Sequence, residues 1–414
     1  MDIQKLVAAE EELLISLRRH FHEYPELSEQ EFRTLEYIDE RLDAWGIPNV
    51  EIPFGGIFAT IDSGKPGRTI LLRADIDALP IQESPTNLAG PKICVSQNPG
   101  VSHACGHDAH TAMLLVAAKI LTEHKDEWCG KVICMFEQAE EMGDRGIRDL
   151  LPYLETNGIH IDACYGTHMM YSLPAGKIAI SPGAVMAGAM FFCVKINGKS
   201  GHGSMPHLAK NPIDAFTTFD GELASYRMRC VAPNHMLTYS FGMVRAGDTP
   251  NVIPETLIFS GTARFFDDED GLTFRKEFRR ILAYVTEMQG MTAEILLDQY
   301  FPVTVNNEEC AEAARTAIAA VSEDLLGDAE PWMATETFAL TEAIYPGVFT
   351  FTGILDEKAG TGANHHTPEF DVPDKSLVTG VTATLAYTLH MLSHMPDMTS
   401  FEKRDLSEML AMIE

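Results

Sequence analysis

The sequence predicts an α/β protein: a mixed, largely parallel β-sheet with flanking helices that carries an inserted α+β module. Two observations lead to this prediction. Outside residues 185–299, segments of helical periodicity alternate with apolar, strand-like runs, which indicates parallel strands joined by helices. Within 185–299 the order becomes strand, helix, strand, strand, helix, strand, as in a split βαβ or ferredoxin-like module. We therefore expect one discontinuous domain, 1–184 and 300–414, and one inserted domain, 185–299.

The chain opens with two helical segments. Residues 1–26 have the spacing of an amphipathic helix, and 28–46 form a second helix with Ser28 as the expected N-cap. Glu31 lies three residues after Ser28, as in a capping box, and Gly46 is expected to end the helix.

Three apolar runs of the first domain carry titratable side chains at or beyond their ends. Such side chains face the crevice at the carboxyl edge of a parallel sheet, where ligands bind. The runs and their side chains are 69–74 with Asp75 and Asp77, 131–136 with Glu140 and Glu141, and 163–169 with His168.

The inserted module has six predicted elements. Its strands are expected at 190–196, 237–244, 256–266 and 292–298, and its helices at 211–227 and 271–289.

The composition excludes several classes of function. The chain has 414 residues and a net charge of -29, which argues against nucleic acid because phosphate binding needs clustered lysine and arginine. The longest apolar stretch, 113–120, is too short to span a bilayer, and the amphipathic N-terminus does not resemble a signal peptide. Eight scattered cysteines fit reduced thiols better than a disulfide framework. We expect a cytoplasmic protein that binds neither nucleic acid nor membranes.

The segment HACGHDAH (103–110) concentrates metal-ligating side chains just before an apolar helix expected at 108–121. Cys105 and His107 are two residues apart, so both can face one centre, and zinc and related metals prefer thiolate and imidazole ligands. Two other interpretations stay open. Cys105 could be a nucleophile whose pKa is lowered by the start of the helix, or the histidines could simply cap that helix.

The adjacent carboxylates Glu140 and Glu141 follow the apolar strand VICMF. A pair of glutamates is usually a solvated turn, but this position places at least one of them at the crevice. Two neighbouring side chains point in different directions. One can therefore bind a metal while the other moves a proton for an attacking water, the division that metal-assisted hydrolysis requires.

Other candidates are spread along the chain. His168 in YGTHM and His366 in NHHTPEF can complete a ligand set, although lone histidines are more often structural. In the inserted module, glycines surround His202, and Asn251 and Arg264 lie in NVIPE and GTARFF. Arg264 can pair with an acidic neighbour or present its guanidinium to a substrate carboxylate.

In their order, several stretches resemble the dizinc aminoacylase/aminopeptidase clan, most strongly its amidohydrolase branch of hippurate and auxin-conjugate hydrolases. The stretches are LRADIDALP, HACGHDAHTAMLL, QAEE, GTHM, SGHGSMPH, NVIPE, GTARFF and HHTPEF. They span nearly the whole chain. The resemblance implies a zinc-peptidase-like catalytic domain (1–184 and 300–414) holding two divalent metal ions, zinc, manganese, cobalt or nickel. It also implies a lid domain (185–299) that forms a homodimer.

The resemblance also implies roles for individual residues. Glu140 would be the general base, and Asp77 would help to position the metals. His202 matches a lid histidine that reaches the active site of the other subunit, and Asn251 and Arg264 match residues near the substrate carboxylate. The implied metal ligands are Cys105, His107, Glu141, His168 and His366.

The expected function is hydrolysis of the amide bond of an N-acyl amino acid or a dipeptide-like substrate, with Glu140 as general base. One departure from the family pattern is TETF (335–338), where Thr337 replaces an aspartate. Two alternatives remain: a cysteine-dependent hydrolase that uses Cys105, and a non-catalytic homologue that binds a peptide or a metal or acts as a scaffold.

Overall fold

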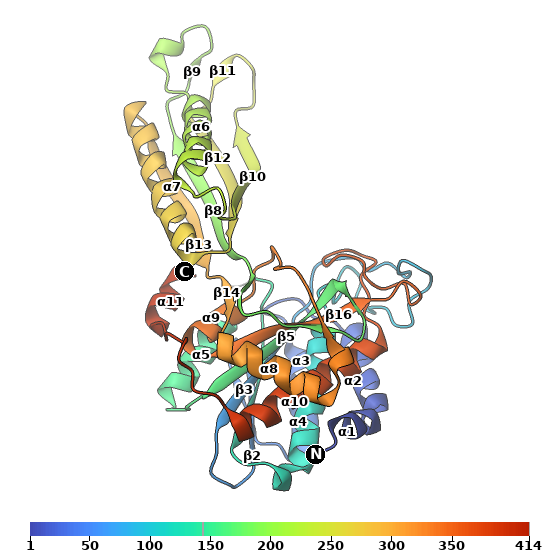
Figure 1. Ribbon diagram of the computed structural model, residues 1–414. Helices are drawn as coiled ribbons and strands as arrows, with labels where there is room; N and C mark the ends of the chain where they lie inside the picture. The colour runs from blue at the N-terminus through green and yellow to red at the C-terminus, as the bar shows by residue number, and fades with distance from the viewer. Residues whose placement is uncertain (143–144, 414) are drawn as a thin grey trace. The chain divides into compact units, whose positions relative to one another are not determined.

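The structure is a computed structural model that describes residues 1–142 and 145–413 (Figure 1). The chain divides into two compact units. The first comprises Met1–Val185, Val305–Glu330 and Thr337–Met409. The second is formed chiefly by Met186–Thr304 together with the short segment Pro331–Glu336.

The first unit is built on an eight-stranded sheet of order β1-β2-β4-β3-β5-β16-β6-β15. Its four central strands, β4, β3, β5 and β16, are parallel, which confirms the predicted mixed, largely parallel sheet. The strands are β1 (Asn49–Ile52), β2 (Gly56–Asp62), β3 (Thr69–Asp75), β4 (Lys131–Glu137), β5 (Ala163–Pro174), β6 (Ile178–Ala179), β15 (Leu326–Gly327) and β16 (Gly347–Leu355).

Helices cover this sheet. Most residues of α4 are buried, and this helix contacts β3, β4 and β5 of the sheet as well as α2, α3 and α10. It is apolar on nearly every face, as expected of a helix enclosed between a sheet and other helices. The helices are α1 (Ile3–Ala9), α2 (Glu11–Glu23), α3 (Phe32–Ala44), α4 (His107–Glu123), α5 (Ile147–Thr156), α8 (Glu308–Val321), α9 (Phe338–Ile344), α10 (Asp374–His394) and α11 (Leu406–Met412), with short 3-10 turns at Lys125–Glu127 and Glu323–Leu325. A further 3-10 turn, Pro206–Leu208, belongs to the second unit.

Two details of the N-terminal helices differ from prediction. The single helix expected over 1–26 is two helices, because the chain tightens at Glu10, whose N–H donates to the carbonyl of Val7. Ser28 is not the N-cap of α3, which begins after Glu31. The Glu26 carboxylate accepts hydrogen bonds from the first free N–H groups of α3 instead, so the Ser28 hydroxyl is available for another partner.

The second unit contains a four-stranded antiparallel sheet of order β10-β12-β8-β13. Its elements follow the chain order strand, helix, strand, strand, helix, strand. They are β8 (Gly188–Asn197), α6 (Pro212–Cys230), β10 (Leu237–Ala246), β12 (Thr256–Phe265), α7 (Asp268–Met288) and β13 (Thr292–Phe301). Contacts among Phe192, Phe219, Phe259 and Phe278 join the sheet to both helices. Because one face of the sheet packs against these helices, buried and half-buried residues alternate along β8.

Two further pairs of short strands lie outside the two main sheets. In the second unit, β9 (Gly201–His202) pairs with β11 (Val252–Ile253). The other pair is β7 (Gly183–Met186) with β14 (Thr304–Asn306).

The pairing of the cysteines and the composition of the helices can be compared with the predictions from the sequence. Each of the eight cysteines is unpaired, as the scattered spacing predicted. Across the described part of the chain, no helix is both long enough and apolar enough to cross a bilayer.

Candidate metal centre

The carboxyl ends of the central strands gather the predicted polar side chains at one edge of the sheet. Asp75 is the last residue of β3, and β4 ends three residues before Glu140. His168 was expected at a strand end, but it lies within the longer β5. Since Leu72 pairs with Tyr165, the same advance along both strands brings Asp75 and His168 to one level of the sheet.

Six predicted residues from four segments of the chain come together here. Their ligand atoms form three overlapping groups, each within 4.8 Å: Cys105 with His107 and His168; Cys105 with Glu141 and His366; and His107 with Glu140 and Glu141.

Hydrogen bonds fix the orientation of two of the histidines. The Nδ1 atom of His107 lies 3.1 Å from Oδ1 of Asp77, which turns Nε2 toward the centre. The Nδ1 atom of His168 lies 2.8 Å from the carbonyl oxygen of Met169, and its Nε2 lies 3.4 Å from Sγ of Cys105. A carboxylate or carbonyl behind an imidazole is the usual arrangement for a histidine that ligates a metal.

Two buried acceptor atoms at the centre make no hydrogen bond: Nε2 of His107 and Oε1 of Glu141, which lie 3.8 Å apart. The Nε2 atom of His366 lies 3.2 Å from the same glutamate oxygen. Buried polar atoms without partners are costly, and lone pairs directed at one point are satisfied by a cation. A set of one thiolate, imidazoles and carboxylates suits zinc and its neighbours in the first transition series.

The backbone around the centre is strained at two positions. Ala139, just before the glutamate pair, has φ 55°, and His366 has φ 60°, a region that residues other than glycine rarely adopt. Both conformations are held by hydrogen bonds. The Ala139 N–H donates to the Glu31 carboxylate at 2.8 Å, and the His366 N–H donates to the Ala104 carbonyl at 2.9 Å. Strain maintained in this way is typical of functional sites.

The environment of Cys105 distinguishes a metal ligand from a nucleophile. Burial raises the pKa of the Cys105 thiol well above its ordinary value, and the nearby Glu141 carboxylate is the second cause of this rise. A catalytic cysteine needs a lowered pKa to be a thiolate near neutral pH. This environment opposes ionisation of the thiol unless a cation binds it, which favours the metal-ligand interpretation.

His110 and Asp75 belong to the surroundings of the centre; the sequence placed Asp75 at the crevice and did not select His110. Asp75, His107 and His110 form a further group of close ligand atoms. Both nitrogens of His110 are already engaged: Nδ1 lies 2.6 Å from Oδ1 of Asp75, and Nε2 accepts the Met169 N–H at 2.9 Å. His110 is thus a supporting residue. Its position three residues after His107 on α4 is the signal that could have found it.

Comparisons with known proteins agree with this geometry. The model of peptidase family M20/M25/M40 matches residues 71–390. The chain belongs to this family. Its fold resembles the crystal structure of the Bacillus subtilis YXEP protein, a dinuclear metal binding peptidase from the M20 family, with a TM-score of 0.78 and 30% identity over 93% of this chain and 99% of that one.

Two curated relatives of this M20 protein extend the comparison. Thermostable carboxypeptidase 1 of Saccharolobus solfataricus is 33% identical over 90% of the chain and 94% of the relative. The N-acyl-L-amino acid amidohydrolase of Geobacillus stearothermophilus is 36% identical over 74% of the chain and 82% of the relative. Family membership confirms the resemblance predicted from the motifs.

Of its three predicted site residues, the second unit of this M20 protein places His202 and Asn251 together and Arg264 apart from them. His202 lies exposed on β9, next to Asn251, whose carbonyl accepts the Gly203 N–H. Arg264 lies at the far end of β12, opposite Ala189, whereas His202 follows Asn197 at the other end of β8. Eight residues of strand span roughly 26 Å.

Arg264 is half-buried at its own end of the sheet. Its guanidinium donates to the Thr335 hydroxyl and lies 5.0 Å from the Phe191 ring. Among the described residues, none of the ion pairs joins Arg264 to a carboxylate.

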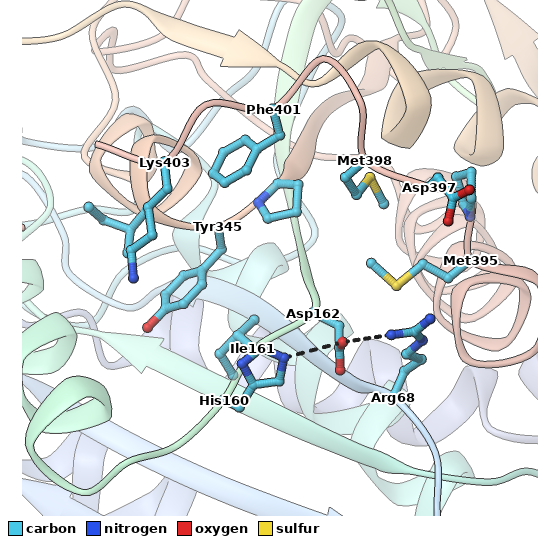
Figure 2. A pocket seen from close by; sticks show the side chains of 13 residues that line it. Arg68, His160, Ile161, Asp162, Tyr345, Met395, Asp397, Met398, Phe401 and Lys403 are labelled. Carbon is cyan, nitrogen blue, oxygen red and sulfur yellow. Dashed lines mark hydrogen bonds and ion pairs between the residues drawn. The ribbon is translucent and has the colours of Figure 1, made fainter. Parts of the chain in front are cut away.

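A pocket lies at the opposite, amino ends of the parallel strands (Figure 2). It has a volume of about 370 Å³ and is lined by residues that precede β3, β5 and β16, including Arg68, Asp162 and Pro346. Figure 2 shows Asp162 between His160 and Arg68. None of the predicted site residues lines this pocket.

Proposed function

We propose that this M20 protein is a dinuclear metal-dependent amidohydrolase that cleaves the amide bond of N-acyl amino acids or related small amides. The observation that carries the proposal is the convergence of the lone pairs of His107, Glu141, His168, His366 and Cys105 on one centre beside Glu140. The two ions would be zinc, manganese, cobalt or nickel, which accept this mixture of sulfur, nitrogen and oxygen ligands.

Each part of the site has a distinct role. When bound, the metals polarise the amide carbonyl and lower the pKa of the attacking water. Glu140 takes the proton of that water and delivers it to the leaving amine. Asp77 holds the His107 ring, and His202 of the other subunit stabilises the developing oxyanion.

The substrate class follows from relatives and from the chemistry of the second unit. An amidohydrolase of N-acyl-L-amino acids and a carboxypeptidase, both named above, act on substrates with a free carboxylate beside an amide. Arg264 is the proposed partner of that carboxylate from the same chain, and Asn251, which lies beside His202 at the other end of the sheet, is the proposed partner from the other subunit. The planar guanidinium of Arg264 suits a planar, charged acceptor.

We further propose a homodimer formed through the second unit. Its edge strand β13 exposes three successive apolar residues, Ile295, Leu296 and Leu297. An uncovered apolar edge strand promotes pairing with another strand. In a dimer, the exposed His202 is available to a second chain, whereas Arg264 lies at the other end of the strands.

The unpaired cysteines support a reducing, cytoplasmic setting.

The experiment that tests the function combines metal analysis with a substrate screen. We expect the purified protein to hold two divalent ions per chain, to release an amino acid from at least one N-acyl amino acid, and to lose activity on chelation. Re-addition of zinc, manganese, cobalt or nickel should restore activity to different degrees. Chelator-resistant turnover with an acyl group trapped on Cys105 would instead establish the cysteine-hydrolase alternative.

The proposed exchange of His202 is tested by mixing two inactive variants. Co-expressed His202→Ala and Glu140→Gln chains form mixed dimers in which one site has both groups. Random pairing should recover about one quarter of wild-type activity. If His202 serves its own chain, each site in a mixed dimer lacks one group. Absence of recovery in proven mixed dimers would then refute the exchange.

A further inference from the structure

A buried hydrogen-bond network joins the central sheet to the proposed general base. Arg73 of β3 is its cation, with a nearly inaccessible side chain. Its Nε donates to Oε2 of Glu137 at 2.7 Å, and its Nη1 donates to Oδ2 of Asp75 at 2.7 Å. Paired in this way with the last residues of β3 and β4, Arg73 forms a rigid anchor at the carboxyl edge.

Thr337 connects this anchor to Glu140. Its buried hydroxyl accepts a hydrogen bond from Nη2 of Arg73 at 2.9 Å and donates to Oε1 of Glu137 at 2.7 Å. Its main-chain N–H donates to Oε1 of Glu140 at 3.2 Å. One residue thus contacts the sheet through its side chain and the carboxylate of the base through its backbone.

We infer that Thr337 is a positioning residue that holds the Glu140 carboxylate in its working orientation. The inference rests on the proposed function, in which Glu140 moves the proton of the attacking water. A glutamate on a turn has several rotamers, and a proton acceptor must stay within hydrogen-bond reach of its donor. The hydrogen bonds of the Thr337 hydroxyl to Arg73 and Glu137 fix the position of the Thr337 backbone. The Thr337 N–H is therefore held where it donates to the Glu140 carboxylate.

The residue type matters at this position. Arg73 supplies one positive charge between the carboxylates of Asp75 and Glu137. A hydroxyl at 337 can accept from the arginine and donate to the glutamate without adding charge. Valine has nearly the same shape as threonine but can do neither, whereas serine keeps both functions.

The test compares Thr337→Val and Thr337→Ser in the full-length, metal-loaded protein on a substrate that the wild type hydrolyses. Thr337→Val should lower kcat about tenfold, the scale of one hydrogen bond to a charged group, with KM within about twofold. Thr337→Ser should restore kcat to within about twofold of wild type. Metal content should stay at the wild-type value in both.

A matched control separates positioning from general destabilisation. Thr350→Val also removes a buried hydroxyl of the same sheet, one that lies 2.9 Å from the Tyr165 hydroxyl. It should lower thermal stability and leave kcat unchanged. Equal losses of kcat in the two valine variants, or undiminished kcat in Thr337→Val, would overturn the inference. A wild-type protein without any amide hydrolysis would instead contradict the proposed function.

Hydrogen exchange provides a measurement that does not depend on turnover. In the metal-free protein, Glu140→Ala removes the acceptor of the Thr337 N–H. Exchange of that amide should quicken at least threefold, while the amide of Thr350 within β16 should be unaffected. Unchanged exchange at Thr337 would show that its N–H does not hold Glu140.

Discussion

The two ends of the central parallel strands differ in how their charged side chains are partnered. At the amino edge, Asp162 is fully engaged: one oxygen lies 3.2 Å from Arg68 and 3.4 Å from His160, and the other accepts the Thr69 N–H at 2.8 Å (Figure 2). At the carboxyl edge, buried atoms of His107 and Glu141 face each other without a hydrogen bond.

This difference separates an edge that stabilises the fold from one that is built to bind. A carboxylate whose oxygens are both hydrogen-bonded within the protein contributes to stability and is less available to a ligand. Unpaired acceptors and strained backbone reduce stability, and they persist where a ligand is to be bound. Substitutions at the carboxyl edge should therefore alter metal binding and turnover, and those at the amino edge should alter stability alone.

The largest effect is expected at the glutamate pair. Glu141→Gln should lose bound metal, because an amide is a poor substitute for a carboxylate ligand, and with it all activity. Glu140→Gln should keep most of its metal and lose hydrolysis by about 10²-fold or more, the scale of a lost general base. Metal analysis and turnover measured on the same samples distinguish the two roles; equal metal loss in both variants would contradict them.

The next effect concerns Asp77, which contacts three groups of the centre. Its Oδ1 lies 3.1 Å from His107, and its Oδ2 accepts the Glu141 N–H at 3.0 Å and the Ser28 hydroxyl at 2.6 Å. Asp77→Asn should weaken metal affinity about 10- to 100-fold, as loss of a carboxylate behind a histidine ligand does. A competition titration with a chelating dye measures this; unchanged affinity would make Asp77 a structural residue only.

Asp162→Asn tests the amino edge. We expect a loss of about 1–3 kcal/mol in the free energy of unfolding, because a nearly buried acceptor of several hydrogen bonds loses its charge. The kcat and metal content should be unchanged. Arg68→Gln is the control: its side chain is half exposed, so it should cost below about 1 kcal/mol. Reduced turnover of a fully folded Asp162→Asn variant would contradict the expectation that substitutions at the amino edge alter stability alone.

The smallest effect is expected for Ser28→Ala. It removes one of the hydrogen bonds to Asp77 and leaves the cap of α3 intact, because Glu26 provides that cap. Metal affinity should fall about two- to tenfold, the scale of one hydrogen bond, with little change in thermal stability. A large drop in stability without any change in affinity would restore the capping role that the sequence predicted for Ser28.

Local sequence predicted which side chains gather at the candidate site. Thiol, imidazole and carboxylate side chains placed beyond apolar strands sufficed to predict where Cys105, His107, Glu140 and Glu141 gather. Parallel strands bring their carboxyl ends to one edge whatever the loops between them contain. The same reasoning failed for Ser28, since a capping box and a hydrogen bond to a distant carboxylate are identical in sequence.

By itself, the sequence determined the fold class, the order of elements in the inserted module and the family, because hydrophobic periodicity and motif spacing are local properties. Only the tertiary structure decided that both nitrogens of His110 are engaged, that Glu31 holds the strained turn at Ala139, and that Thr337 lies between Arg73 and Glu140. These contacts join residues from 35 to 264 positions apart. They depend on which side chains strand register and helix packing bring face to face, and no local pattern encodes that choice.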